Sequence, residues 1–136
     1  IVVDGEGADK FISINVINAK SLTSAKKIAF SVASSPLVKT AVAGEDPNWG
    51  RVVMGIGKSG EKVDPNKISI KFGEFLVAEN GSPIENIDLK KIREYMKWDS
   101  ILIEINLNLG SEKFECYTCD FTHDYIDINA DYKNST

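Results

Sequence analysis

The sequence predicts an α+β fold, a two-layer arrangement in which helices pack on one face of a mixed or antiparallel sheet. Some segments alternate apolar and polar residues, which is typical of half-buried strands. Others place apolar residues three or four positions apart, which is typical of helices. Hairpins and helices mix along the chain, and no regular strand–helix repeat is present. With 136 residues, 43% hydrophobic and 26% charged, residues 1–136 are expected to form a single domain.

The strand predictions depend on period-two alternation bounded by turn residues. Ile12 and Ile14 face one way in the first complete strand, while Ser13 faces the other. The clearest strand has apolar residues at every odd position and leads through the turn at Gly110 into a partner strand. Strands are predicted over residues 1–3, 11–17, 67–72, 74–78, 101–109 and 113–119.

The helix predictions depend on apolar spacing together with start and stop residues. Ser21 or Thr23 suits the N-cap of the first helix, and Asp88 suits that of the fourth. Pro36 separates the first two helices, and Gly44 ends the second. Helices are predicted over residues 22–32, 37–43, 49–57 and 89–96, a last helical turn or two within 122–132, and loops over 45–48, 58–66 and 80–83.

Composition excludes several classes of function. The formal net charge is −4 and Lys or Arg residues are never more than two in a row, whereas a phosphate backbone attracts a concentrated basic stripe. No apolar run approaches the roughly 18 residues of a membrane helix, and a secretory signal is absent. We therefore expect a cytoplasmic protein with no nucleic-acid and no membrane partner.

The two cysteines, Cys116 and Cys119, form a C-x-x-C pair within a predicted strand. A separation of three in a strand puts the side chains on opposite faces, which is poor geometry for a disulfide. One histidine and no second cysteine pair leave too few ligands for a zinc site. We expect two reduced structural cysteines and no metal.

Two terminal segments carry candidate binding residues. Near the start, glycines flank Glu6 in Asp4-Gly5-Glu6-Gly7, so its carboxylate is held in a defined position where it can pair with a substrate ammonium group. An ordinary turn with solvated acids is the alternative. Near the end, the amide of Asn129 offers both donors and acceptors to an amino acid, although chain ends are also commonly frayed.

A third candidate segment, residues 35–51, concentrates hydrogen-bonding side chains around glycines and a proline. Such groups are costly to bury unless they are satisfied. They fit a polar site and a buried structural network equally well, and the residues concerned are Lys39, Thr40, Asp46, Asn48 and Arg51. The only histidine, His123, fits a helix start or the surface better than a general base, and no nucleophile or nucleotide-binding motif is present.

Four segments together resemble a known family. They read D-G-E-G-A, S-P-L-V-K-T-A-V-A-G-E-D-P-N-W-G-R, T-C-D-F-T-H-D-Y and I-N-A-D-Y, and they span residues 4–132 in that order. These segments are similar to the β-chain signatures of the ornithine acetyltransferase family, also called glutamate N-acetyltransferases. The resemblance implies that this chain is the C-terminal portion of such a β chain.

The resemblance implies an enzyme of arginine biosynthesis whose precursor cleaves itself before a threonine. The threonine then carries acetyl from N2-acetylornithine to glutamate, and acetyl-CoA is a second donor in the bifunctional members. This nucleophile lies outside the chain, so no catalytic residue is expected here, no cofactor is implied, and the chain alone is expected to be inactive. The implied partner is the α chain of the same precursor, in an αβ heterodimer that assembles further.

The resemblance also assigns substrate-binding roles. Glu6 corresponds to the glutamate that binds the substrate amine, and Asn129 to the substrate-binding asparagine. Asn134 stands where the family has a threonine or serine contact, and Asp9 replaces the usual threonine after E-G-A. The competing hypothesis is a non-catalytic module for folding, assembly or ligand binding.

Overall fold

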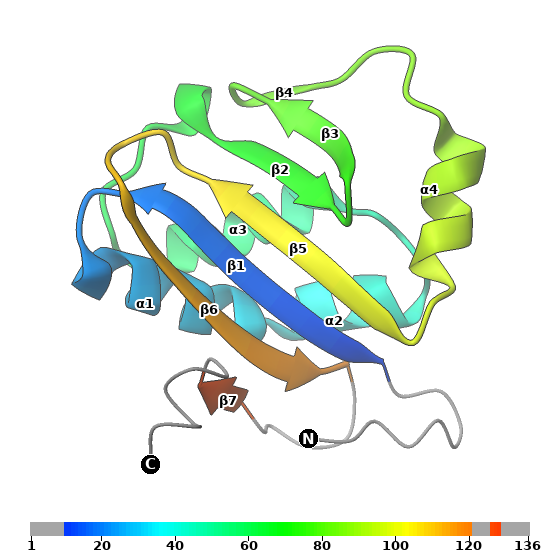
Figure 1. Ribbon diagram of the computed structural model, residues 1–136, viewed down its shortest axis with the longest axis horizontal. Coiled ribbons are helices and arrows are strands. Elements are labelled where there is room, and N and C mark those ends of the chain that lie inside the picture. The colour runs from blue at the N-terminus through cyan, green and yellow to red at the C-terminus, as the bar shows by residue number, and fades with distance from the viewer. Residues whose placement is uncertain (1–9, 121–125, 129–136) are drawn as a thin grey trace.

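The computed structural model describes residues 10–120 and the backbone of residues 126–128. Within these residues one seven-stranded sheet has the strand order β4-β3-β2-β5-β1-β6-β7 (Figure 1). Its strands are β1 (Phe11–Ala19), β2 (Ser69–Phe72), β3 (Phe75–Glu79), β4 (Ser82–Pro83), β5 (Ser100–Asn106), β6 (Glu112–Cys119) and β7 (Ile126–Ile128). The helices are α1 (Leu22–Ala33), α2 (Pro36–Ala43), α3 (Trp49–Lys58) and α4 (Leu89–Met96), with a 3-10 turn at Pro65–Lys67.

Strand β1 lies between two strands that come from the far end of the chain. It runs parallel to β5, with Ile12 opposite Ile101, and antiparallel to β6, with Ile14 opposite Cys116. The remaining pairs in the sheet are antiparallel. The sheet is therefore mixed, which confirms the predicted α+β class.

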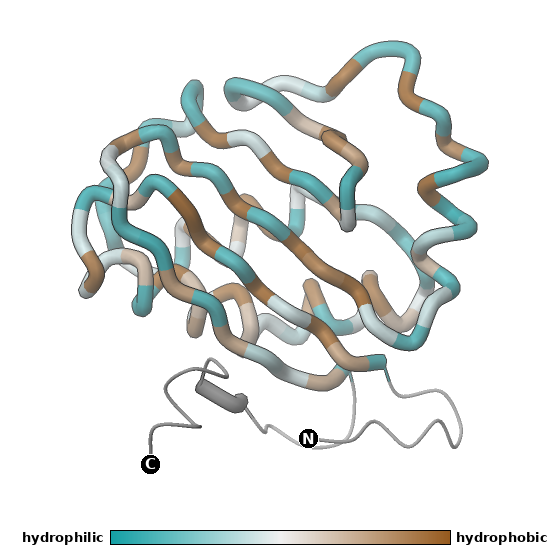
Figure 2. Tube along the Cα trace, in the orientation of Figure 1, coloured by the Kyte–Doolittle hydropathy of each residue, from teal (hydrophilic) through white to brown (hydrophobic). Residues whose placement is uncertain are grey.

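Helices α1, α2 and α3 cover one face of the sheet, and α4 stands at the side, between β4 and β5 in the chain (Figure 1). The strands alternate apolar and polar residues along their length (Figure 2). Alternate residues of β1, such as Ile12 and Ile14, are fully buried beneath the helices, while Ser13 is only half-buried. The core therefore lies between the sheet and the three helices, as the predicted two-layer arrangement requires.

Side-chain caps fix where the helices begin. Of the two predicted N-caps for α1, Ser21 is the one used, and its hydroxyl oxygen accepts a hydrogen bond from the backbone N–H of Ser24 at 3.1 Å. Asp88 caps α4 in the same way, through the N–H of Lys91 at 3.1 Å. Each cap satisfies one of the amide groups that the first turn of a helix leaves without a partner.

Some strand and helix boundaries differ from the predictions, chiefly where the residues of a turn determine where a strand begins or ends. Strand β5 ends at Asn106, before the predicted residue 109, because the side chain of Asn106 accepts from the N–H of Asn108, whose φ is 54°. Strand β4 occupies part of a predicted loop, because Asn80 and Gly81 form a two-residue hairpin turn with φ of 50° and 80°. Helix α3 continues past Gly57 to Lys58.

The predicted helical turn within residues 122–132 is wrong for Ile126–Ile128. This segment is strand β7, which pairs antiparallel with β6, and Ile128 lies opposite Cys116. The alternation of Ile126, Asp127 and Ile128 is the period-two signal of a strand.

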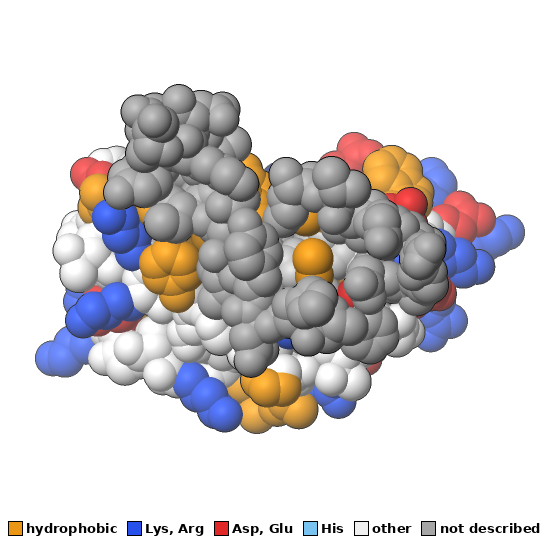
Figure 3. All heavy atoms as spheres, turned by 90° about the horizontal axis from the view of Figure 1, so that it is seen from below, with side chains coloured by type: hydrophobic (Ala, Val, Ile, Leu, Met, Phe, Trp, Pro, Cys, Tyr) orange, Lys and Arg blue, Asp and Glu red, His pale blue; other side chains and the backbone are white. Residues whose placement is uncertain are grey.

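Surface charge and helix length complete the description of the fold. On the face shown in Figure 3, the described Lys and Arg side chains are spread around the rim and form no continuous patch. In the described part of the chain, every helix is too short or too polar to cross a bilayer.

Candidate functional site

The structure describes only some of the candidate residues. Glu6, Asn129 and Asn134, like His123, lie outside the described residues. Their roles remain predictions. The five candidates between Lys39 and Arg51 lie on α2, on α3 and in the turn between these helices.

The α2–α3 turn has a fixed backbone path. Glu45 has φ of 60°, in the left-handed region, and its N–H donates to the carbonyl of Val42 at 2.9 Å. The N–H of Asp46 donates to the carbonyl of Ala41 at 2.8 Å. Together these bonds satisfy carbonyls at the end of α2 that would otherwise lack partners.

Side chains of this segment also bond to one another. Asn48 accepts from the N–H of Arg51 at 3.1 Å as the N-cap of α3, and its amide donates to the carboxylate of Asp46 at 3.2 Å. The guanidinium of Arg51 donates to the carbonyl of Leu37 at 3.0 Å, which ties α3 to α2. These three side chains therefore form a network that holds the turn together.

The other two candidates belong to α2 itself. The hydroxyl of Thr40 donates to the carbonyl of Pro36 one turn earlier, at 2.7 Å. Lys39 is 8% exposed, which is unusual for a lysine. Lys39 therefore faces the interior of the protein, whereas Thr40 lies on the exposed side of the helix.

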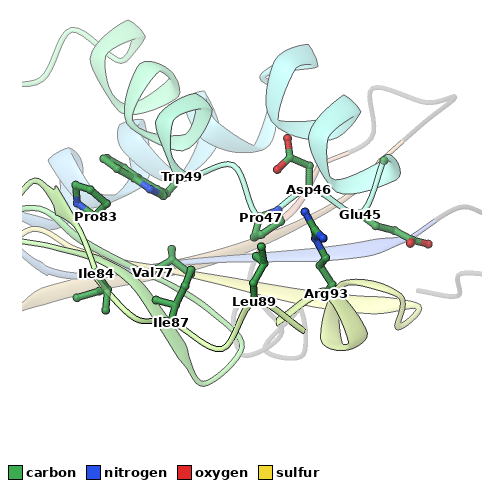
Figure 4. A pocket seen from close by; sticks show the side chains of 11 residues that line it. Glu45, Asp46, Pro47, Trp49, Val77, Pro83, Ile84, Ile87, Leu89 and Arg93 are labelled. Atoms are coloured by element: carbon green, nitrogen blue, oxygen red, sulfur yellow. The ribbon is translucent and has the colours of Figure 1, made fainter. Parts of the chain in front are cut away.

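The turn forms one wall of a pocket of about 400 Å³ (Figure 4). The opposite wall comes from β3, β4 and α4, so the pocket joins segments that are far apart in the sequence. Of the five described candidates between Lys39 and Arg51, only Asp46 lines it. The lining residues are Gly44, Glu45, Asp46, Pro47, Trp49, Val77, Pro83, Ile84, Ile87, Leu89 and Arg93.

The pocket combines apolar walls with charges of both signs. Arg93 extends from α4 toward the turn that carries Asp46, and Glu45 points away from the pocket (Figure 4). The carboxylate of Asp46 is oriented by its hydrogen bond from Asn48. A pocket that combines apolar walls with a few charged residues is a candidate binding site for a small molecule. Sequence reasoning missed Arg93, because α4 comes to the turn only through the tertiary fold.

A second polar feature lies where the described chain enters β1 and leaves β6. The N–H of Lys10 donates to the carboxylate of Asp120 at 2.8 Å, and the N–H of Asp120 donates to the carbonyl of Lys10 at 3.0 Å. The ammonium of Lys10 donates to the carbonyl of Trp98 at 2.7 Å. We call these three residues the strand-end junction. The only signal in the sequence is that Lys10 and Asp120 each lie at the end of a predicted strand.

The two cysteines lie on opposite faces of β6, as predicted. Cys116 is fully buried and Cys119 is half-buried on the other face of β6, and both are thiols. Burial, with a smaller contribution from the charge of Glu115, raises the pKa of the Cys116 thiol to about 12. A thiol with so high a pKa is not a nucleophile at neutral pH. Among the described residues, no group of three or more acidic, histidine or cysteine side chains is placed to hold a metal ion.

The fold and these polar features define an α+β domain with oppositely charged groups in a pocket beside a helix–helix turn, and with a buried junction at the ends of two central strands. The chain belongs to the ArgJ family, whose family model matches residues 1–134. The resemblance found in the four sequence segments is thereby confirmed.

Relatives and a solved structure agree with this family. The chain is 52% identical over 134 residues to the arginine biosynthesis bifunctional protein ArgJ of Ruegeria pomeroyi, covering 98% of this chain and 33% of that protein. The ArgJ protein of Gluconobacter oxydans is 48% identical over 134 residues, with 98% and 32% covered. The crystal structure of ArgJ from Bacillus halodurans superimposes with a TM-score of 0.80 at 36% identity, covering 90% of this chain and 57% of that one. The chain thus spans about a third of the length of the curated relatives it matches.

Proposed function

We propose that this chain is part of a cytoplasmic acetyltransferase of arginine biosynthesis, which moves acetyl from N2-acetylornithine to glutamate. Residues 1–136 would form one domain of it, the C-terminal portion of the β chain. The observation that supports this most strongly is the 52% identity over 98% of the chain to a protein named for arginine biosynthesis. Identity at this level over nearly the whole chain favours retention of the relatives' activity.

In the proposed reaction the chemistry takes place on a threonine that lies outside this chain. Its hydroxyl oxygen attacks the acetyl carbonyl of N2-acetylornithine, the amide C–N bond breaks, and ornithine leaves with the proton. The α-amine of glutamate then attacks the threonine ester and regenerates the hydroxyl. The partner α chain supplies the oxyanion hole. The chain alone is therefore inactive, and acetyl-CoA would serve as an additional donor in a bifunctional enzyme.

This chain contributes substrate-binding groups to that reaction. Glu6 pairs with the free side-chain ammonium of ornithine or its acetylated form, and Asn129 and Asn134 hydrogen-bond the substrate through their amides. Asp46, Asn48 and Arg51 would support the assembled site by holding the α2–α3 turn, and Lys39 and Thr40 would support it through their positions on α2.

The positions of Lys10 and Asp120 support a common site for Glu6 and Asn129. The two backbones meet at this pair, so the segments that carry the candidates begin from the same place. Glu6 lies four residues before Lys10, and four extended residues span at most about 14 Å. Asn129 directly follows Ile128, which is paired to Cys116 on β6. Chain length therefore permits both side chains to reach one ligand.

A non-catalytic module for folding, assembly or ligand binding is the alternative function. It is favoured by the use of Asn48, Thr40 and Arg51 in hydrogen bonds within the fold. Titration calorimetry of ornithine against residues 1–136, with Glu6→Ala beside it, distinguishes the two. Strong binding that is unchanged in Glu6→Ala would place the ligand away from the proposed substrate site.

The direct test uses the full-length parent protein. We expect mass spectrometry to show two chains produced by self-cleavage and an assay to show acetyl transfer from N2-acetylornithine to glutamate. Glu6→Gln should lower kcat/KM about tenfold to a hundredfold, because a hydrogen bond to a charged group is lost. Glu79→Gln, at the exposed end of β3, is the matched control and should leave the rate unchanged. Absence of both cleavage and transfer in the wild type would reject the proposal.

A further inference from the structure

We propose that the Asn80-Gly81 turn between β3 and β4 is a site of covalent modification, at which the side-chain amide of Asn80 is lost when the turn opens. Asn80 is the only asparagine of the sequence that is followed by glycine. Both residues are exposed, so water reaches them directly. The inference concerns the chemical stability of the protein with time, and it does not depend on the proposed acetyl transfer.

The reaction joins the side chain of Asn80 to the backbone that follows it. The backbone nitrogen of Gly81 attacks the side-chain carbonyl carbon of Asn80, a new C–N bond forms, and ammonia leaves with the proton that the nitrogen gives up. Water then opens the cyclic imide at either of its carbonyl groups, which gives aspartate or isoaspartate. Asparagine is among the thermolabile residues, and glycine favours the attack because no Cβ hinders the nitrogen.

Two hydrogen bonds of the folded turn oppose this reaction. The N–H of Gly81 donates to the carbonyl of Ile68 at 2.8 Å, and the N–H of Asn80 donates to the hydroxyl oxygen of Ser69 at 3.1 Å. The attacking nitrogen must give up its proton and swing toward the preceding side chain. The bond from Gly81 to Ile68 therefore has to break before the attack.

Close packing against the 3-10 turn also holds Gly81 in place. A Cβ at Gly81 would clash with the carbonyl oxygen of Pro65 and would lie 3.2 Å from the Cα of Asn66. The backbone of Gly81 thus fits against residues 65–66 with no room for a further atom. The hairpin turn has to separate from this neighbour to reach the geometry of attack, so we expect the rate to follow the fraction of molecules in which the turn is open.

The turn lies at the edge of the sheet, where opening costs the least free energy. Strand β4 has two residues, is exposed and is paired, among the described strands, with β3 alone. Local opening of such an edge requires less free energy than unfolding of the whole domain. The modification should therefore accumulate slowly in the native protein, during brief openings of this hairpin.

The isoaspartate product does not fit the folded turn. Its main chain runs through the former side chain and contains one more carbon atom, so the two N–H groups of the turn no longer match Ile68 and Ser69. Strand β4 then loses its register with β3, in which Glu79 lies opposite Ser82. Because Pro83 lines the pocket beside the α2–α3 turn, the modification loosens one wall of that pocket.

The test follows residue 80 by peptide mapping and mass spectrometry of the full-length parent protein, incubated at mildly alkaline pH with and without urea. We expect the peptide that contains Asn80 to gain mass about tenfold or more faster in urea than in the native protein, because the turn is then always open. Ser69→Ala, which removes the acceptor for the Asn80 N–H, should raise the rate in the native protein about fivefold.

Two further variants are the controls. Ser111→Ala, at an exposed position between β5 and β6, should leave the native rate unchanged. Asn80→Gly removes the amide but keeps a residue pair that suits this turn, and its peptide should show no change of mass. Circular dichroism checks that Ser69→Ala is folded, and if it is not, the comparison of native and urea-unfolded wild type decides alone. Equal rates in those two states, equal native rates in folded Ser69→Ala and wild type, or an unmodified Asn80 in urea would each overturn the inference.

Discussion

Burial strongly changes the chemistry of Cys116. Its side chain is fully buried on β6, opposite Ile14 of β1 and Ile128 of β7. The apolar surroundings oppose formation of the thiolate, and the neighbouring carboxylate of Glu115 opposes it further. The thiol is therefore protected in the folded state both by access and by its high pKa.

We expect stability to fall at alkaline pH because of this thiol. The pKa of Cys116 is about 12 in the folded state, raised from 9.0. The unfolded chain therefore loses this proton first, and the stabilisation present below pH 9 disappears as pH rises toward 12. Urea unfolding at several pH values should show this decline, and Cys116→Ala should show a shallower one. An identical slope in the variant would assign the decline to other groups.

Single residues also show which features of the structure can be predicted from the sequence and which cannot. The opposite orientation of Cys116 and Cys119 could be predicted, because a strand alternates its faces locally. The burial of Lys10 and Asp120 could not, because their contact joins residues 110 positions apart. Arg93 was missed for the same reason, since its place in the pocket depends on where the fold puts α4.

At the scale of elements, the glycine at position 55 allows helix α3 to pack closely on helix α1. A Cβ at Gly55 would lie 3.3 Å from both Cα and Cγ2 of Val32, whereas one at Gly57 would meet nothing within 4 Å. The two positions share a helix and a residue type, and they differ in what faces them. Gly55 is therefore needed for the contact between α1 and α3.

This difference predicts opposite effects of alanine. Gly57→Ala should raise the free energy of unfolding by about 0.5 kcal/mol, because alanine favours the helix. Gly55→Ala should lower it by about 1 kcal/mol, because the backbone of Val32 cannot move aside without repacking. Thermal and urea unfolding of both variants would measure this. A stabilised Gly55→Ala protein would show that the α1–α3 contact is adaptable.

Most elements could be predicted because their signals are local. The caps Ser21 and Asp88 and the alternating apolar positions of β1 and β5 all lie within the segments they define. The errors occur where a turn outweighs periodicity. Asn108 turns the chain after β5 although Leu107 continues the alternation, and the Asn80-Gly81 turn creates the short strand β4.

At the scale of the whole molecule, strand pairing and burial are greatest at the centre of the sheet and least at its β4 edge. Strand β1 is paired on both sides along most of its length, whereas β4 has two residues, pairs only with β3 and is exposed. Amide protons in a structure exchange according to the free energy of the opening that exposes them. The centre should therefore open only when the whole molecule unfolds.

Hydrogen exchange followed by mass spectrometry or NMR would check this gradient. We expect the amides of Ile14 and Ile103 to exchange slowest, and the amide of Ser82 in β4 to exchange within the shortest labelling times, since Pro83 carries no amide proton. Addition of moderate urea should raise exchange first at β4 and last at β1. Comparable rates in β1 and β4 would contradict the arrangement of the sheet.

The candidate site is the part of the molecule that sequence reasoning defines least completely. The family resemblance indicates Glu6 and Asn129 as substrate-binding residues, and the local concentration of hydrogen-bonding side chains indicates the polar residues of the α2–α3 turn as candidates. Neither could show that Asp46 and Arg93 line the same pocket or that Lys10 and Asp120 meet. These relations depend on the sheet order, which no local pattern contains.

The central position of β1 in the sheet also has a consequence for folding during translation. Residues 11–19 are synthesised before the other described strands, yet both of their neighbours, β5 and β6, lie within residues 100–119. About ninety intervening residues must be synthesised before the middle of the sheet can close, so most native contacts have high contact order and form late. Among the described elements, only α1, α2 and α3 can cover the apolar side of β1 during that interval, and we expect a nascent chain that depends on chaperones until β6 has emerged.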